Sequence, residues 1–300
     1  MAMRLTEVKP DLARTKASEA IAGGVITANA DNAAMHAAEN RTTLIYNAWG
    51  DHRVGADILC YMTGYNDPRV EKMFLPNDVG NYVGIRIGID VAGKATAMTK
   101  YSNLIIESTT PYLWFNAAEA TFLRAEYELR WGSEETAREL YEEAIRLSFE
   151  ERGASGADAY VADAASRPAA YTDPLGMYSA AAQSTITIAW APGADNFEEH
   201  LERIITQKWI AIFPLGGEAW SEHRRTGYPR LMPVVADKSG GGVDVAQGAR
   251  RLPYPVEEYQ QNNANLQAAI QMLDAEQTNG NRTGDQMGTR VWWDCKPYNN

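Results

Sequence analysis

The stretch from Leu113 to Phe149 constrains the fold of this chain more than any other part of the sequence. Its residue pattern predicts two antiparallel helices joined at Trp131-Gly132-Ser133. Ser133 can cap the second helix, and the two glutamates after it suit the positive end of the helix dipole. One face of this second helix shows the i, i+3, i+4, i+7 spacing of buried residues: Ala137, Leu140, Tyr141, Ala144, Ile145 and Ser148.

This hairpin has the pattern of a tetratricopeptide repeat, a unit of roughly 34 residues. The glycine, small, aromatic and small positions of that pattern are occupied by Gly132, Ala137, Tyr141 and Ala144. A single unit of this kind cannot bury its apolar face alone. The sequence therefore predicts that further helices stack on the hairpin.

A weaker copy of the pattern lies near the N-terminus, where Asp11–Ile21 is predicted to be helical. Its apolar side consists of Leu12, Ala13, Ala17, Ala20 and Ile21. The alanines repeat the four-then-three spacing found in the central hairpin. The helix before it would be Ala2–Val8, which is too short for a full repeat. We therefore expect that the chain begins inside a repeat and that upstream residues have been removed or left out.

The remaining chain alternates between helical segments and long irregular stretches, the latter over residues 33–110 and 151–195. A loose alternation predicts a strand at Tyr82–Ile89, although its glycines oppose one. Further helices are expected at Asp57–Met62, Asn196–Phe213 (with Asn196 as N-cap), Gly217–His223 and Tyr254–Ala269. No second domain boundary is visible. We expect a mainly α fold of helical hairpins with long irregular loops, in one domain over residues 1–300 that is truncated at its N-terminus.

The composition narrows the function classes. A formal net charge of -11 argues against a nucleic-acid partner, which requires a basic face. Cys60 and Cys295 are far apart and have no metal-ligand spacing, which favours two free thiols over a disulfide. The four histidines form no zinc-binding pattern, so no metal site is expected. No apolar run could span a bilayer, and the N-terminus has neither a signal-peptide core nor a lipid-acceptor cysteine.

Several segments, spread in order along the chain, carry the motifs of one known family. Phe122–Glu126 (FLRAE) looks like an FLxAEA signature, and Ile205–Leu231 is similar to a QKWIAL…EAW…RRTGYP block. Asp67-Pro68-Arg69 matches a DPR motif, and Arg250–Glu258 matches an RR.YP..E segment that precedes a run of asparagines. The chain thus resembles the SusD-like (RagB/SusD) family. Its ANADNA run at Ala28–Ala33 and its Trp-Trp-Asp ending resemble the branch associated with starch binding at the outer membrane.

The resemblance implies an α-α superhelix and a lipoprotein at the outer surface of the outer membrane of Bacteroidota-type bacteria. It implies that the protein binds glycans, such as starch or other polysaccharides, without catalysis and with no cofactor. The glycan would be handed to a TonB-dependent transporter of the SusC type. The chain lacks the family's N-terminal portion, including the lipidated cysteine. Any attachment to the membrane would therefore be through a lipid anchor absent from this chain.

Sugar binding without catalysis requires flat aromatic faces for the C–H side of the sugar and planar polar groups for its hydroxyls. The run from Tyr46 to Arg53 holds both kinds of group in one loop. We predict as glycan contacts Tyr46, Asn47, Trp49, Asp51 and Arg53, with Tyr82 and Trp190 as weaker candidates. The alternative is a structural loop whose Trp49 fills the core.

Other charged residues allow rival interpretations. Arg224-Arg225, after a helix and before Tyr-Pro, could form an anion site, but a structural role in pairing with buried glutamates or capping carbonyls is favoured. Glu119 and Glu126 share a helix face at a separation that a glycosidase carboxylate pair allows. For this pair too a structural role is favoured, in which the glutamates pack within the repeat and pair with an arginine. The rival functions are therefore a glycoside hydrolase and a tetratricopeptide-type scaffold that binds peptides or proteins.

Overall fold

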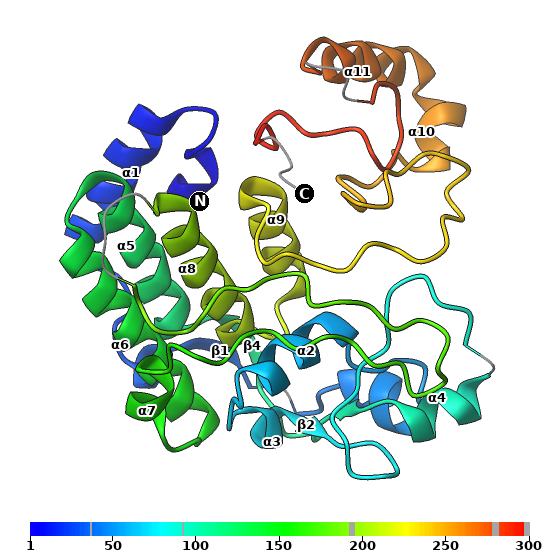
Figure 1. Cartoon of the computed structure of the whole chain (residues 1–300). Helices are drawn as coiled ribbons and strands as arrows, with labels where there is room; N and C mark the ends of the chain where they lie inside the picture. Colours follow the sequence, from blue (N-terminus) through cyan, green and yellow to red (C-terminus); the bar gives the residue numbers. More distant parts are fainter. Residues whose placement is uncertain (37, 92, 192–195, 278–281, 297–300) are drawn as a thin grey trace.

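The structure is a computed structural model that describes residues 1–36, 38–91, 93–191, 196–277 and 282–296 (Figure 1). It is mainly α-helical, as predicted. The α-helices in chain order are α1 (Pro10–Gly23), α2 (Ala56–Gly64), α3 (Val70–Met73), α4 (Lys94–Lys100), α5 (Ala117–Trp131), α6 (Glu134–Arg152), α7 (Ala157–Val161), α8 (Phe197–Ala211), α9 (Gly216–Thr226), α10 (Val256–Gln261) and α11 (Asn263–Ala275).

Short strands and tight helical turns shape the loops. Strand β1 (Ala33–Met35) pairs antiparallel with β4 (Tyr112–Phe115), and β2 (Phe74–Leu75) pairs antiparallel with β3 (Asn103–Leu104). The 3-10 turns are η1 (Ala2–Leu5) and η2 (Asn29–Asp31), and η3 (Leu44–Ala48) is a π-helical turn. Residues 192–195, at the end of the predicted irregular stretch 151–195, lie outside the described residues.

The predicted central hairpin is confirmed as α5 and α6, joined at Gly132 and Ser133. The Ser133 hydroxyl accepts a hydrogen bond from the Thr136 backbone N–H at 3.4 Å, so the predicted cap is formed. Asn116 caps α5 in the same way, accepting from the Glu119 N–H at 2.8 Å. Each helix therefore begins at a residue whose side chain satisfies an otherwise unpaired backbone donor.

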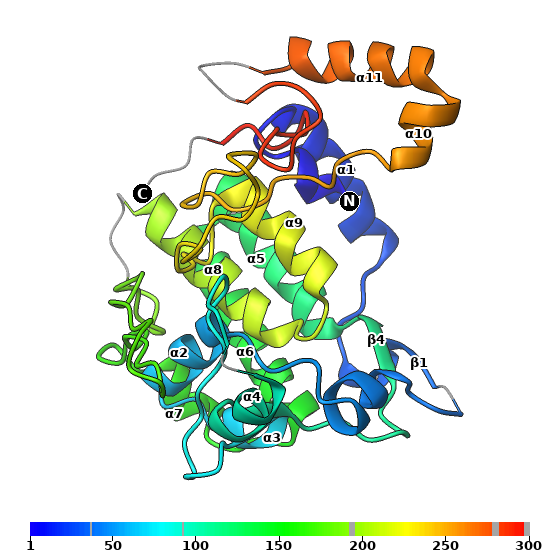
Figure 2. The ribbon, with the colours of Figure 1, turned by 90° about the vertical axis from the view of Figure 1, so that its right-hand side faces the viewer.

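The predicted face of α6 forms the centre of the hydrophobic core. Ala137, Tyr141, Ala144 and Ile145 are fully buried, and Ser148 is buried with them, while Leu140 packs against the core from its edge. The small residues of α5 allow α6 and α8 to approach it closely, and α1 lies beside it. Figures 1 and 2 both show α5, α6 and α8 packed side by side, with α9 against α8.

The N-terminal repeat-like helix is also confirmed, as α1, and it begins at Pro10. Its predicted apolar side is only partly buried. Ala13 and Ala17 face the core, whereas Ala20 is exposed and Leu12 retains 43% of its surface in contact with solvent. The short turn η1 packs on α1 in the place of a full first helix.

The two helices that follow the long loop form close to their predicted positions. Asn196 precedes α8, but the predicted side-chain cap is wrong, because its amide donates to Glu199 Oε2 at 2.8 Å and accepts no backbone N–H. Helix α9 extends three residues beyond the predicted end, so Arg224 and Arg225 lie in its last turn and not after it. The left-handed Gly227, at φ +77°, ends this helix.

The final turn of α9 contributes to a buried ion-pair network between α5, α8 and α9. Arg225 binds Glu126 of α5 and Glu222 of its own helix, each at 2.6 Å. It also donates to the Thr6 hydroxyl at 2.8 Å. Lys208 of α8 lies 3.4 Å from both Glu119 and Glu222. The structural interpretation of Arg225 and of both α5 glutamates is thus confirmed, with lysine as the partner of Glu119.

Two predicted elements differ from the structure. The strand at Tyr82–Ile89 is wrong, since Ile85 forms only an isolated bridge to Gly55 and Gly88 adopts a left-handed conformation at φ +81°. The backbone there bonds to separate segments, for example Ile85 N–H to Val54 and Ser102 N–H to Val83. The last helix is split at Asn262 into α10 and α11. These two lie at one end of the molecule in both views (Figures 1 and 2).

In the described part of the chain, none of the helices has the length and apolar character required to cross a membrane. Cys60 and Cys295 are both free thiols, as the sequence favours.

Candidate functional site

The segment from Tyr46 to Arg53, here called the aromatic loop, begins within the π-helical turn η3 and continues beyond its end. Asn40 holds the start of this region, because its amide donates to the Thr110 carbonyl at 2.7 Å and its backbone N–H donates to the Ser108 carbonyl at 2.6 Å. The Trp49 N–H donates to the Leu44 carbonyl at 2.6 Å and closes the turn. The loop is therefore fixed by hydrogen bonds to the segment that precedes β4.

Trp49 points out of this loop, with 56% of its surface exposed. The core-filling alternative for Trp49 is therefore wrong. The next residue, Gly50, is buried at φ +65°, and a Cβ atom there would lie 3.0 Å from the sulfur of Met98. Glycine thus allows the tight turn that projects the indole outward.

Charged groups flank the exposed indole. Asp51, two residues on, forms an ion pair with Lys94 of α4 at 2.7 Å, and both side chains are about half exposed. Because this pair lies in solvent, it contributes little to stability. Its oxygen and nitrogen atoms remain accessible to the hydroxyls of a ligand beside the indole.

The other predicted residues of the loop hold its shape. Asn47 donates to the Ile106 carbonyl at 3.0 Å and accepts from the Asn103 amide at 3.2 Å. Arg53 donates to the His52 carbonyl at 2.6 Å, and burial lowers the pKa of its guanidinium. Tyr46 packs partly against the core, where burial raises the pKa of its phenol. Asn47, Arg53 and Tyr46 therefore shape the same loop from which Trp49 and Asp51 reach solvent.

The two weaker candidates lie elsewhere. Tyr82 is half-buried against the core. Trp190 is 8% exposed and stacks in parallel on His200 with 3.9 Å between the ring centroids. Its indole N–H donates to Glu134 at 3.2 Å. Since a sugar cannot reach this buried ring, Trp190 is not included in the candidate site.

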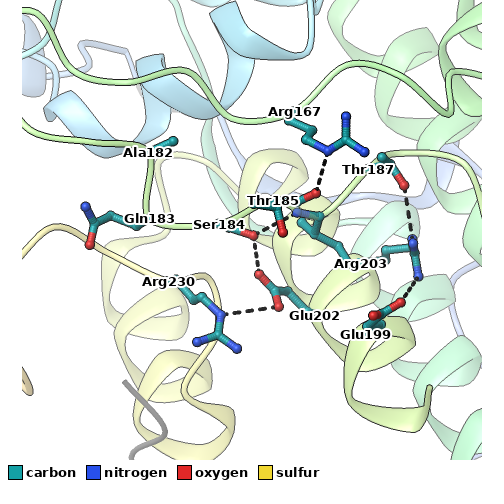
Figure 3. A pocket seen from close by; sticks show the side chains of 11 residues that line it. Arg167, Ala182, Gln183, Ser184, Thr185, Thr187, Glu199, Glu202, Arg203 and Arg230 are labelled. Atoms are coloured by element: carbon teal, nitrogen blue, oxygen red, sulfur yellow. Dashed lines mark hydrogen bonds and ion pairs between the residues drawn. The ribbon is translucent and has the colours of Figure 1, made fainter. Parts of the chain in front are cut away.

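A second feature, here called the polar cleft, has a volume of about 800 Å³. The segment 182–187, the first turns of α8 and two single arginines form its walls. Its lining residues are Arg167, Ala182, Gln183, Ser184, Thr185, Ile186, Thr187, Glu199, Glu202, Arg203 and Arg230. Figure 3 shows Glu202 between Ser184 and Arg230, and Arg203 between Thr187 and Glu199.

The polar cleft is not among the sites predicted from the sequence. A weak signal was present, because Glu199, Glu202 and Arg203 occupy positions i, i+3 and i+4 and therefore share one face of α8. The polar run Gln183-Ser184-Thr185 was a second signal. No local rule places these segments against each other.

The part of the chain that the structure describes holds no group of three or more histidine, cysteine, aspartate or glutamate side chains arranged to bind a metal ion.

The packed helical hairpins and the long loops between them define a helical, loop-rich protein. Over residues 1–294 the chain matches the SusD-like family, the SusD and RagB outer membrane lipoproteins, and it belongs to this family. This match confirms the family resemblance and, with the solved relatives, the predicted fold. No curated protein matches the chain.

Several solved structures are similar over almost the whole chain. A SusD homologue from Bacteroides thetaiotaomicron is 50% identical, with a TM-score of 0.94, over 99% of this chain and 63% of that chain. A SusD homologue from Bacteroides uniformis is 43% identical, with a TM-score of 0.89, over 98% of this chain and 62% of that chain. A chitin-binding SusD homologue from Flavobacterium johnsoniae is 40% identical, with a TM-score of 0.90, over 99% and 61%. This chain thus spans 61–63% of the length of these relatives.

Proposed function

We propose that this protein binds glycans without catalysis, with the aromatic loop as a contact surface. The observation that carries the proposal is the exposed indole of Trp49 on a loop fixed by hydrogen bonds, with the polar groups of Asp51 and Lys94 near it. Family membership supports the same class of ligand, since one relative binds chitin. Starch and other polysaccharides, together with their oligosaccharides, are the proposed ligands.

The buried carboxylates support a non-catalytic role. A glycosidase requires two carboxyl groups that reach the substrate. Glu126 is fully buried in ion pairs with Arg225 and Arg130, and Glu119 is 3% exposed beside Lys208. The two α5 glutamates therefore pair within the helix packing and do not form a carboxylate pair of the glycosidase kind.

The proposed location is the outer face of the outer membrane, through a lipid anchor, as the family description of outer membrane lipoproteins supports. The proposed partner is a TonB-dependent transporter of the SusC type, which would receive the glycan. Copurification of the full-length lipoprotein from detergent-solubilised membranes tests this partner. Recovery of the lipoprotein without any β-barrel transporter would contradict it.

Replacing Trp49 with alanine is expected to weaken glycan binding about 30-fold. If a sugar ring covers roughly 80 Å² of the indole, about 25 cal/mol per Å² gives about 2 kcal/mol. The measurement is affinity electrophoresis against starch, chitin oligosaccharides and further polysaccharides, with release of reducing ends followed in parallel. The protein is expected to be retarded on at least one glycan and to release no reducing ends.

Trp292→Ala is the matched control, because Trp292 is also exposed, at 46%, but lies beside Lys9 at the N-terminus of α1. This variant is expected to bind like the unmodified protein. Equal losses in both variants would show that the aromatic loop has no special role. Absence of retardation on every glycan would contradict the proposed function itself.

A further inference from the structure

The polar cleft shares no residue with the aromatic loop, and its chemistry differs. Its walls contain arginines, glutamates, hydroxyls and an amide, and none of the described residues that line it is aromatic. A volume of about 800 Å³ lies within the range of small-molecule sites. The cleft therefore has the size of a ligand site and a lining suited to a strongly polar ligand.

The charges in the cleft do not balance. Glu202 is neutralised, because it accepts a hydrogen bond from the Ser184 hydroxyl and lies 3.4 Å from Arg230. Glu199 is half exposed and lies 3.8 Å from Arg203. Arg167 is exposed and has no carboxylate partner among the described residues. Among the described residues that line the cleft, one positive charge is thus left over.

The arginine without a carboxylate is held in place by backbone carbonyls. Its Nε donates to the Thr185 carbonyl at 3.1 Å, and its Nη1 donates to the Ala165 carbonyl at 3.0 Å. The Arg167 side chain therefore keeps a fixed orientation while its other N–H groups remain available. A guanidinium held in this way binds a carboxylate at a low entropic cost.

A second arginine offers a buried donor. Arg203 is 5% exposed, and its Nε has no hydrogen-bond partner among the described residues. Its Nη2 donates to the Thr187 hydroxyl at 3.2 Å, which fixes the plane of the guanidinium. A buried N–H without an acceptor costs free energy, and a ligand oxygen that reached this atom through a shift of the guanidinium would recover that cost.

Neutral polar groups complete the lining. The Thr185 side chain is exposed, and the half-buried Gln183 uses its amide N–H₂ to bind the Ala181 carbonyl at 2.7 Å, so its carbonyl oxygen can accept. Hydroxyl and amide groups beside a positive charge match the hydroxyls and the carboxylate of an acidic sugar. We propose that the polar cleft binds the carboxylate of an acidic sugar residue, with Arg167 and Arg203 as its cationic donors. This inference rests on the proposed function and adds acidic carbohydrates to its ligands.

The test is isothermal titration calorimetry of the purified protein with tri-galacturonic acid and with its methyl ester. The two probes have the same sugar hydroxyls and differ in the negative charge. The acid is expected to bind at least tenfold more tightly, and its binding should weaken as salt rises from 50 mM to 500 mM. Arg167→Gln is expected to weaken binding of the acid about 10-fold to 100-fold and to leave binding of the ester unchanged.

Two further variants serve as controls. Arg167→Lys keeps the positive charge and is expected to keep part of the preference for the acid. Arg138→Gln removes an exposed arginine that pairs with Glu135 on the surface of α6, and it should behave like the unmodified protein. Thermal unfolding of each variant shows whether it is folded. If Arg167→Gln does not fold, the ratio of the affinities of the unmodified protein for acid and ester tests the inference. A ratio of at least ten supports it, and a ratio near one contradicts it.

The outcomes separate this inference from the proposed function. Equal affinity for acid and ester, with starch or chitin still bound, would overturn the acidic-sugar site and leave glycan binding intact. No binding of any glycan would contradict both. Competition by acetate or inorganic phosphate at the concentration of tri-galacturonic acid would show a general anion site, which also overturns the proposal. A preference for the acid that Arg167→Gln removes supports it.

Discussion

Replacing Arg225 with methionine is expected to lower the free energy of unfolding by about 3 to 5 kcal/mol. The Arg225 side chain is fully buried and binds Glu126 and Glu222, each at 2.6 Å. Its removal takes one positive charge away from two buried carboxylates. A buried negative charge without a full set of positive partners costs free energy at low dielectric. Urea unfolding at pH 7, followed by circular dichroism, measures the change.

The pH dependence of this loss is a sharper test. Burial by itself would raise the pKa of Glu222, but Arg225 and Lys208 hold it well below its usual value, and Arg225 with Arg130 lowers that of Glu126. A carboxylate with a lowered pKa in the folded state stabilises the protein above about pH 4.3, and this contribution is lost as the pH falls further. The difference between Arg225→Met and the unmodified protein is therefore expected to shrink below about pH 4.

Arg138→Met provides the matched control, because Arg138 and Glu135 form a 3.4 Å pair that is largely exposed. Its loss is expected to change stability by less than about 0.5 kcal/mol. Similar values for the two arginine variants would contradict a stabilising role for the buried network. A double variant with Glu126→Gln should recover part of the Arg225 loss, since neighbouring sites are not additive.

Replacing Tyr141 with alanine is expected to lower the free energy of unfolding by about 3 to 5 kcal/mol. The side chain is fully buried, and its ring lies 6.1 Å from Phe122 and 5.5 Å from that of Trp190. Truncation would leave a cavity where α5 and α6 meet the segment before α8. The measurement is the same urea unfolding experiment.

Tyr141→Phe separates the ring from the hydroxyl. The hydroxyl donates to the buried Ile188 carbonyl at 2.7 Å, so its removal is expected to cost about 1 to 2 kcal/mol. If phenylalanine and alanine were equally costly, the hydrogen bond and not the packing of the ring would account for the effect.

The helical part of the fold could be predicted from the sequence because its signals are local. The spacing of Ala137, Tyr141 and Ala144 specifies a buried helix face, and Ser133 specifies where that helix begins. The long loops could not be predicted equally well. Ile85 and its neighbours bond to distant segments one at a time, so no regular pattern marks them. That residues 1–300 form a single domain stays a prediction.

The candidate site was predicted in part. The residue types alone predicted an aromatic and polar loop. They did not show which of the two tryptophans, Trp49 or Trp190, would be exposed. Their environments differ: Trp49 is 56% exposed just before the turn at Gly50, and Trp190 is stacked on His200 in the core. The polar cleft combines segments that are distant in sequence, with Arg167 and Arg230 on opposite sides of α8 along the chain.

The sequence by itself determined the helical hairpins, a structural role for Arg225 and the family of this protein. These depend on residue spacing within one element and on ordered motifs, which any chain displays before it folds. Only the tertiary structure decided which tryptophan faces solvent, which partner Glu119 has and where the polar cleft lies. Such features depend on contacts between residues far apart in the sequence, and no local periodicity encodes those contacts.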